Sequence, residues 1–287
     1  MSAHIPHTPA RVGVLGGGRM GSGIAHAFLL AGSDVTVVER DQDAASAAEA
    51  RIAESVDRSL SRGFDGNAAE LRSRLTVATD AAAFGLHGLV IEAVPEDLDL
   101  KVEALARVEA QLASDAVIAS NTSSIPLARL AEALERPERL IGLHFFNPVP
   151  ASALVEIVVG AQTSGELPAM ARGWVEALGK TPITVADSPG FASSRLGVAI
   201  ALEAIRMVED GVASAADIDL AMELGYRHPT GPLKTTDIVG LDVRLGIAEQ
   251  LERELGPRFA PPRLLRDMVA EGHLGRKSGR GFYEWND

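Results

Sequence analysis

The spacing of hydrophobic residues changes near residue 188, and it predicts two kinds of structure along the chain. Up to Asp187, short runs rich in β-branched residues alternate with stretches of helical periodicity. The runs are RVGVLG, DVTVVE, LTVATD, LVIEAV, AVIAS, LIGLHFF, LVEIVV and PITVAD. Alternation of strands and helices is typical of a parallel sheet with crossover helices. We therefore expect an α/β domain over residues 11–188.

Beyond Ser188-Pro189-Gly190 the apolar residues follow helical spacing. The segments ASSRLGVAIALEAIRMVEDG and LDVRLGIAEQLEREL both have it. Ser214 is followed three residues later by Asp217, a pattern that predicts a capping box at the start of a further helix. We expect an all-α C-terminal domain over residues 189–287.

A glycine cluster, VLGGGRMGSGIA, lies between the first expected strand and the first expected helix. Its spacing, Gly16-x-Gly18-x-x-Gly21, is the fingerprint of dinucleotide binding, in which glycines allow a tight turn, close approach of a pyrophosphate and close helix–strand packing. The N–H groups of the helix that follows would face the phosphates. The alternative is a glycine-rich turn without a ligand. The fingerprint favours a Rossmann-type domain, with Arg19 and Met20 also at the cofactor.

Glu39 ends the next expected strand, 18 residues after Gly21. A carboxylate here would accept hydrogen bonds from the adenosine ribose and repel the 2′-phosphate of NADP, which favours NAD. Arg40 could bind that phosphate instead, and an ordinary solvated acid is a further interpretation of Glu39.

The segment LIGLHFFNPVPASALVEIVV contains two β-like runs around a loop with two prolines. If the runs form a hairpin folded about Pro150, residues whose numbers sum to 300 lie opposite each other, and His144 faces Glu156. A carboxylate beside an imidazole fixes its tautomer and stabilises the imidazolium, as general-base catalysis requires. The alternative is a core histidine with satisfied hydrogen bonds.

The residues SNTSS, 120–124, follow a strand at the edge where open α/β sheets bind ligands. They fit either a ligand-binding loop or the N-cap of a helix over IPLARLAEAL. Arg58 and Arg62 form a short basic stripe on a predicted helix, a pattern that is usually a solvated face.

Composition narrows the classes of function. The chain has 287 residues, 46% of them hydrophobic, and a net charge of −12, which argues against nucleic-acid or anionic-membrane partners. It contains no cysteine, which excludes disulfides and thiolate catalysis. Apart from His144 the histidines are scattered, so we expect no metal site. No signal-peptide pattern or long apolar stretch is present, so we expect a cytoplasmic protein.

Several stretches together resemble the L-3-hydroxyacyl-CoA dehydrogenase family, in particular its bacterial 3-hydroxybutyryl-CoA dehydrogenases. They are GGGRMGSGIA, IEAVPEDLDLK, SNTSSI, GLHFFNPVP, LVEIVV, SPGF, GPLKTTDIVGLD and LGRKSGRGFYEW, and they extend from about residue 12 to the end. The resemblance implies NAD-dependent oxidation of a short-chain L-3-hydroxyacyl-CoA, such as 3-hydroxybutyryl-CoA, to the 3-ketoacyl-CoA in fatty acid metabolism. It also implies a homodimer formed through the helical domain.

The resemblance also implies roles for individual residues. His144 would accept the hydroxyl proton, Glu156 would orient it, and Ser123 would hold the substrate oxygen near the nicotinamide. The implied cofactor-binding positions are Gly16, Gly18, Arg19, Met20, Gly21, Glu39, Glu96, Lys101, Ser123, Asn147 and Lys277. The implied CoA contacts are Ser55 and Arg62.

Two residues depart from the family pattern. Arg62 stands where the family has a lysine, and Ser194 stands where it has an active-site asparagine that helps to hold the substrate. Two alternative functions therefore stay open. One is a dehydrogenase of a free hydroxy acid, such as a sugar acid or carnitine, on the same scaffold. The other is a crystallin-like structural protein that binds NAD(H) without catalysis.

Overall fold

A computed structural model describes residues 7–285 and divides the chain into two compact units, Met1–Ser188 and Pro189–Asp287. Residues 1–6, part of the segment in which we expect no signal peptide, lie outside the described residues, as do residues 286–287 of the expected C-terminal domain.

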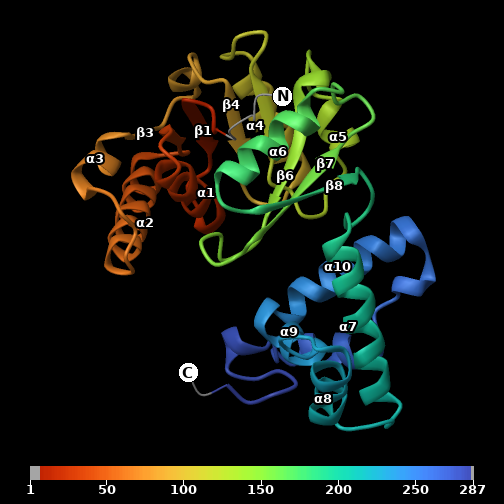
Figure 1. Ribbon diagram of the computed structural model, residues 1–287. Helices are drawn as coiled ribbons and strands as arrows, with labels where there is room; N and C mark the ends of the chain where they lie inside the picture. The colour runs from red at the N-terminus through yellow and green to blue at the C-terminus, as the bar shows by residue number, and fades with distance from the viewer. Residues whose placement is uncertain (1–6, 286–287) are drawn as a thin grey trace, which may run out of the picture. The chain divides into compact units, whose positions relative to one another are not determined.

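The first unit contains an eight-stranded sheet in the order β3-β2-β1-β4-β5-β6-β7-β8 (Figure 1). Its strands are β1 Arg11–Leu15, β2 Asp34–Val38, β3 Leu75–Ala78, β4 Leu89–Glu92, β5 Val117–Ser120, β6 Leu140–Phe145, β7 Leu154–Val159 and β8 Thr181–Ala186. All eight predicted runs form strands. The sheet is parallel through β6, as predicted, whereas β7 pairs antiparallel with β6 and β8 runs parallel to β7. The direction reverses there because a short loop connects β6 directly to β7.

Helices cover both faces of this sheet, so its central strands are buried on both sides. The helices are α1 Arg19–Leu30, α2 Gln42–Ser61, α3 Ala68–Ser73, α4 Leu98–Glu109, α5 Leu127–Ala131 and α6 Leu167–Ala177, with short 3-10 turns η1 Ala81–Phe84 and η2 Pro137–Arg139. One hydrophobic cluster joins the sheet to α1, α2 and α6, and a second joins its other face to η1 and α4. Successive side chains of a strand point to opposite faces of the sheet, so each strand contributes side chains to both clusters in turn.

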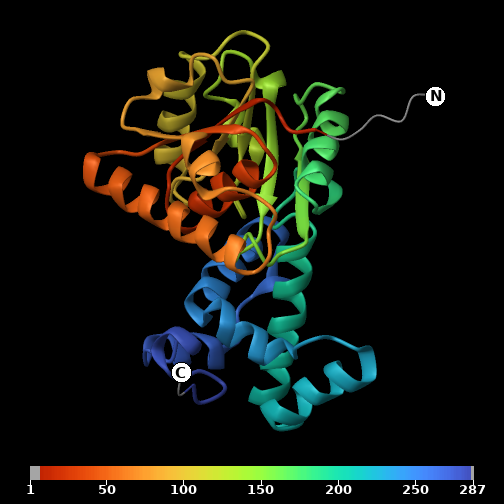
Figure 2. The same ribbon diagram turned by 60° about the vertical axis from the view of Figure 1, so that its left-hand side comes forward.

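The second unit is helical, as predicted. It contains α7 Ser193–Glu209, α8 Ala215–Tyr226, α9 Pro232–Val239, α10 Leu241–Leu255 and α11 Arg263–Ala270, with 3-10 turns η3 Pro257–Phe259 and η4 Arg276–Ser278. The other helices pack around α7 (Figure 2). Ser214 is the N-cap of α8, as predicted, and its hydroxyl accepts a hydrogen bond from the Asp217 N–H at 3.2 Å. The Asp217 carboxylate accepts from the Ser214 hydroxyl at 2.6 Å, so only the first half of the predicted capping box is found.

The C-terminal segment of the second unit is held by the buried carboxylate of Asp237. Its two oxygens accept hydrogen bonds from Phe282 N, Tyr283 N and Trp285 Nε1, each at 2.9 Å. Buried carboxylates are stable when several donors surround them in this way. The segment that carries Lys277 therefore has a defined place on α9.

A buried histidine in the first unit predicts how stability changes with pH. His26 lies on α1 with Nε2 3.0 Å from the Ser59 hydroxyl and with Nδ1 buried without a partner. Burial lowers the pKa of His26 below its ordinary value of 6.5. The unfolded chain therefore binds a proton more readily, and stability falls as the pH drops below the unfolded-state pKa.

We expect His26→Gln to lose less stability than the wild type on acidification from about pH 7 to pH 5, because the glutamine carries no proton to bind. The measurement is urea unfolding at both pH values. His228→Gln, in the second unit, is the control and should follow the wild type. Parallel losses in His26→Gln and wild type would contradict the prediction.

Candidate active site

The glycine loop between β1 and α1 contains two kinds of glycine. Gly16 has a φ of +90°, and a Cβ on Gly21 would lie 1.7 Å from the Gly16 carbonyl oxygen. A Cβ on Gly17 would lie 2.5 Å from the Cβ of Ala48. The fold itself therefore requires these three glycines. A Cβ on Gly18 would meet no described atom within 4 Å. The lack of a side chain at Gly18 therefore keeps the outer surface of the loop accessible.

The start of α1 is suited to bind an anion. Gly18 is its N-cap and provides no side-chain hydrogen bond, and the first turn contains no acidic residue. The first N–H groups of a helix lack partners inside the helix and form the positive end of its dipole. Together with the open surface at Gly18, they fit the pyrophosphate of a dinucleotide.

The Gly17 peptide is held on both sides. Glu39, which directly follows β2, accepts a hydrogen bond from Gly17 N at 2.7 Å through Oε1. The Gly17 carbonyl accepts hydrogen bonds from Arg51 Nη2 at 2.8 Å and from the Ser22 hydroxyl at 2.6 Å. Glu39 keeps further lone pairs for ribose hydroxyls, so its geometry fits the predicted cofactor role. Arg51 was not predicted from the sequence, because only the packing of α2 against the loop brings its guanidinium to the Gly17 carbonyl.

Arg40 is the residue that we considered for a 2′-phosphate. Its Nε lies 3.0 Å from the Asp41 carboxylate, and both side chains are exposed. The Arg40 guanidinium is thus paired with its neighbour Asp41, although an exposed ion pair of this kind contributes little free energy.

A buried ion network lies beside the carboxyl ends of β4 and β5. Lys101, only 1% exposed, donates to Glu92 Oε1 at 2.6 Å and lies 3.3 Å from Glu96 Oε2. The Ser120 hydroxyl donates to the other oxygen of Glu92 at 2.6 Å. A buried ammonium is tolerated only with such compensation. Lys101 and Glu96 were predicted from the sequence, but Glu92 was not. A carboxylate at the end of an otherwise apolar strand could have indicated it.

Glu96 organises the loop after β5. Its Oε1 accepts hydrogen bonds from the Thr122 hydroxyl at 2.7 Å, from Ser123 N at 2.9 Å and from Ser124 N at 3.0 Å. Burial acts to raise the pKa of Glu96, but the Lys101 ammonium and these hydrogen bonds outweigh it and hold the pKa below its ordinary value. Ser123 thereby has a fixed backbone next to the network.

The N-cap interpretation of this loop is wrong. Helix α5 begins at Leu127 after Pro126, without a side-chain cap. The Thr122 hydroxyl instead accepts a hydrogen bond from Ile125 N at 2.9 Å. Asn121, in the same loop, accepts one from Phe145 N at 2.9 Å and so connects the loop to the end of β6.

His144 and Glu156 form the predicted cross-strand pair. The antiparallel register of β6 and β7 places them opposite each other, which confirms the predicted fold of the hairpin. Nδ1 of His144 lies 2.7 Å from Glu156 Oε2, and both side chains are buried. This contact favours the tautomer with the proton on Nδ1, which puts the basic lone pair on Nε2. Its catalytic use stays a prediction.

Lys180 holds the loop between β6 and β7, on which Asn147 is exposed. The ammonium donates to the carbonyl oxygens of Val149 and Ser152, each at 2.6 Å, and burial lowers the pKa of Lys180. Val149 in turn covers Gly23 of α1, where a Cβ would lie 2.9 Å from the valine Cβ. No local sequence pattern indicates this role of Lys180.

The remaining predicted residues of the first unit lie on α1 and α2. Arg19 is exposed in the first turn of α1, and Met20 packs partly against the core. Ser55 is half-buried on α2 and donates to the Arg51 carbonyl at 2.9 Å. Arg62 was predicted to lie on the helix, but it is the C-cap of α2, because the helix ends at Ser61.

Two predicted residues belong to the second unit. Ser194 is half-buried in the first turn of α7. Lys277 lies in η4, with Nζ 2.6 Å from Asp242 Oδ2. Burial acts to raise the pKa of Asp242, but the Lys277 hydrogen bond outweighs it and lowers the pKa. Lys277 is therefore positioned by an ion pair within its own unit.

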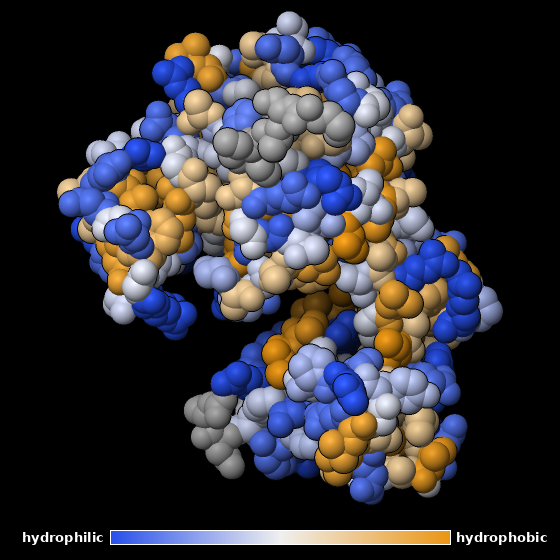
Figure 3. Space-filling model, in the orientation of Figure 1, coloured by the Kyte–Doolittle hydropathy of each residue, from blue (hydrophilic) through white to orange (hydrophobic). Residues whose placement is uncertain are grey.

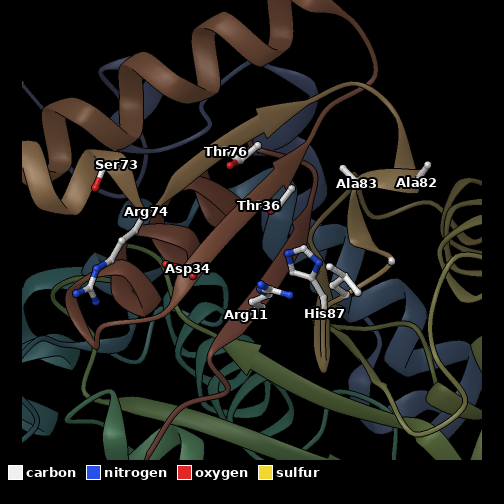
Figure 4. A pocket seen from close by; sticks show the side chains of 11 residues that line it. Arg11, Asp34, Thr36, Ser73, Arg74, Thr76, Ala82, Ala83 and His87 are labelled. Carbon is white, nitrogen blue, oxygen red and sulfur yellow. The ribbon is translucent and has the colours of Figure 1, made fainter.

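An open depression of about 430 Å³ lies at the amino ends of β1 and β2. Arg11 and His87 lie close together in it (Figure 4). The predicted catalytic residues of the first unit lie instead at the opposite edge of the sheet, where the parallel strands have their carboxyl ends. We therefore do not assign the active site to this depression. Among residues 7–285, no cluster of three metal-ligating side chains is found. Within the same range, no helix is long and apolar enough to cross a membrane.

Both units of the chain match known protein families. Residues 11–188 match the model of the 3-hydroxyacyl-CoA dehydrogenase NAD binding domain, and residues 190–285 match the model of the family's C-terminal domain. A 3-hydroxybutyryl-CoA dehydrogenase of Mycobacterium tuberculosis is 44% identical over 280 residues, which are 96% of this chain and 98% of the relative.

Two solved structures extend the comparison. The (S)-3-hydroxybutyryl-CoA dehydrogenase of Ralstonia eutropha is 40% identical, with a TM-score of 0.93 over 98% of this chain and 100% of the other. A diketoreductase described as acting on dicarbonyl compounds is 29% identical, with a TM-score of 0.84 over 97% and 99% of the two chains. The glycine loop, the His144–Glu156 pair and both family models thus agree, and the chain belongs to the 3-hydroxyacyl-CoA dehydrogenase family of NAD-dependent oxidoreductases.

Proposed function

We propose that this protein oxidises an L-3-hydroxyacyl-CoA, with a short chain such as 3-hydroxybutyryl, to the 3-ketoacyl-CoA. The observation that carries the proposal is the buried His144–Glu156 pair, with 2.7 Å between Nδ1 and Oε2. It lies near the carboxyl end of β6, the same edge of the parallel strands from which the glycine loop leaves β1. Open α/β sheets bind their ligands at this edge.

The residues have the following proposed roles. NAD supplies the acceptor for the hydride that leaves C3 of the substrate. His144 Nε2 accepts the proton of the 3-hydroxyl as the C–O bond becomes a carbonyl. Glu156 stabilises the imidazolium that forms, since a carboxylate at 2.7 Å favours the charged ring. The Ser123 hydroxyl donates a hydrogen bond to the substrate oxygen, from a backbone fixed by Glu96.

Cofactor and CoA binding are assigned to separate surfaces of the first unit. Gly18 and the start of α1 bind the pyrophosphate, and Glu39 binds the adenosine ribose. Ser55 and Arg62 bind CoA, for which the exposed guanidinium of Arg62 provides charge for a phosphate. Location in the cytoplasm stays a prediction from the sequence.

A second candidate is the oxidation of a free hydroxy acid. It is favoured by Ser194, which lacks the amide donors of the family's asparagine, and by the likeness to a diketoreductase. Initial rates with NAD on 3-hydroxyacyl-CoA thioesters and on the matching free acids separate the two candidates. Turnover of free acids alone would replace our proposal. The intact pair of His144 and Glu156 argues against a purely structural protein.

We further propose that the second unit forms a homodimer. Several large apolar side chains of this unit are exposed, and Figure 3 shows orange patches on its visible face. They include Leu196, Ile200, Leu220, Leu224, Tyr226 and Ile238. Apolar patches of this kind are typical of surfaces that a partner covers.

Glu39 should make NAD the preferred cofactor. Glu39→Gln keeps an acceptor for Gly17 N but removes the charge, so we expect the ratio of kcat/KM for NAD over NADP to fall about tenfold. Asp43→Asn, on the adjacent turn of α2, removes an acid away from the loop and should leave the ratio unchanged. Equal kcat/KM for both cofactors in the wild type would contradict the assignment.

His144→Gln should lower kcat by roughly 100- to 10,000-fold, because general-base assistance contributes that amount. Glu156→Gln should also lower kcat, since the imidazolium loses its counter-charge. The dissociation constant for NADH, measured by fluorescence titration, should stay near the wild-type value. His87→Gln replaces a buried histidine away from the pair and is the control. Half of the wild-type kcat in His144→Gln would refute the role.

The dimer predicts a mass in solution of about twice the 30.1 kDa of the chain. Leu220→Glu with Leu224→Glu, four residues apart on α8, should shift the protein to the monomer by placing charge in the contact. Leu86→Glu, at a site 76% exposed in the first unit, should leave the dimer intact. Light scattering after size exclusion measures the mass. A wild-type monomer at every concentration would refute this proposal.

A further inference from the structure

The carbonyl group of Gly17 receives hydrogen bonds from side chains of two different helices. Arg51 of α2 donates to it through Nη2 at 2.8 Å, and the hydroxyl of Ser22 of α1 donates to it at 2.6 Å. Arg51 Nε also lies 3.5 Å from the Ser22 hydroxyl oxygen, so the two donors contact each other. The carbonyl, the hydroxyl and the guanidinium thus form one small network within the first unit.

The place of these donors follows from how the helices pack against the glycine loop. Gly17 is buried, and a Cβ there would lie 2.5 Å from the Cβ of Ala48, which precedes Arg51 by three residues on α2. Ser22 is only 4% exposed and lies in the first turn of α1. The Gly17 carbonyl therefore points inward, toward the side of the loop that α1 and α2 cover.

The planarity of the peptide group turns this fixed carbonyl into a fixed N–H group. The Gly17–Gly18 peptide is trans, and in a trans peptide the C=O and the following N–H point in opposite directions. Because the Gly17 carbonyl points inward, the Gly18 N–H points outward. Gly18 is exposed, and among residues 7–285 its N–H has no hydrogen-bond partner. A donor without a partner thus faces the open surface beside the first N–H groups of α1.

A glycine loop needs such restraints more than other loops do. Without a Cβ each glycine can adopt many backbone conformations, so a run of glycines loses much entropy when it is fixed. A flipped Gly17–Gly18 peptide would put a carbonyl oxygen where the N–H now lies, and that oxygen would repel an anion. The flipped state is unfavourable, because Arg51 and the buried Ser22 would both lose their acceptor.

We propose that Arg51 and Ser22 are positioning residues for the cofactor, which hold the Gly17 carbonyl inward and so aim the Gly18 N–H at the pyrophosphate. The inference rests on the proposed function, which places the pyrophosphate at Gly18 and the start of α1. The competing explanation is that the Arg51 guanidinium binds a phosphate directly. Ser22 separates the two, because its buried neutral hydroxyl acts only through the Gly17 carbonyl.

The experiment measures the binding of NADH, ADP-ribose and adenosine to the full-length protein. ADP-ribose contains the pyrophosphate and adenosine lacks it, so the difference between them isolates pyrophosphate binding. NADH is followed by its fluorescence, and the other probes by competition with it. We expect Arg51→Gln to raise the dissociation constants of NADH and ADP-ribose about tenfold, and Ser22→Ala to raise them about threefold, as is typical of a charged and a neutral hydrogen bond. The dissociation constant of adenosine should stay within about twofold.

Steady-state kinetics give a second readout. Arg51→Gln should raise KM for NAD, while kcat and KM for the CoA thioester stay within about twofold. A general loss of folded protein would not separate these constants. Alanine is the best helix former, so Ser22→Ala should fold and test the proposal even if Arg51→Gln does not.

Exposed side chains of α3 provide matched controls. Arg72→Gln removes a guanidinium that is paired with Asp57, and Ser73→Ala removes a hydroxyl that donates to the Glu70 carbonyl. Both changes remove the same chemical groups from the first unit at a distance from the glycine loop in sequence. Both variants should bind every probe as the wild type does.

The outcomes are distinct. Weaker binding of NADH and ADP-ribose in Ser22→Ala and Arg51→Gln, with adenosine unchanged, supports the positioning role. Wild-type binding of ADP-ribose in Ser22→Ala overturns it, and a loss in Arg51→Gln alone then assigns the guanidinium to a phosphate. An equal loss of adenosine binding also overturns it, since it indicates general disruption of the loop. Normal NADH binding without turnover of any thioester refutes the proposed function and leaves this inference standing.

Discussion

The buried ammonium of Lys101 is the interaction on which the geometry of the first unit's site depends. It lies between the carboxylates of Glu92 and Glu96, at 2.6 Å and 3.3 Å. A buried lysine needs opposite charge, and the fully buried carboxylate of Glu92 would be costly without it. The ion network therefore fixes the end of β4, the start of α4 and the loop after β5 as one arrangement. Removal of Lys101 would leave Glu92 buried without a counter-charge, and removal of Glu92 would leave Lys101 with the more exposed Glu96 alone.

This arrangement reaches the His144–Glu156 pair by backbone contacts. Glu96 holds the N–H groups of Ser123 and Ser124, and Asn121 in the same loop accepts a hydrogen bond from Phe145 N. Phe145 follows His144 at the end of β6. The loop that carries Ser123 and the strand that carries His144 are thus set relative to each other, as a shared substrate oxygen would require. The proposed base and the proposed hydroxyl donor depend on one buried network.

The sequence was sufficient for the strands, the glycine loop and the hairpin register. Apolar runs predict strands reliably when both faces are buried, and a hairpin folded about Pro150 places His144 opposite Glu156. It was not sufficient for Arg51, Lys180 or Glu92. Arg51 and Lys180 act on carbonyl groups of loops distant in sequence, and nothing in their local pattern records those partners. The extent of α5 was also missed, because loop hydrogen bonds took the place of the expected cap.

The two buried cations, Lys101 and Arg244, differ in how their charge is compensated. Lys101 has two carboxylates from its own unit, and its charge is satisfied before any ligand arrives. Arg244 lies on α10 of the second unit, and its Nε is buried without a hydrogen-bond partner within the described residues. A compensated charge fixes the geometry around it, whereas a buried charge without a partner lowers the stability of the fold.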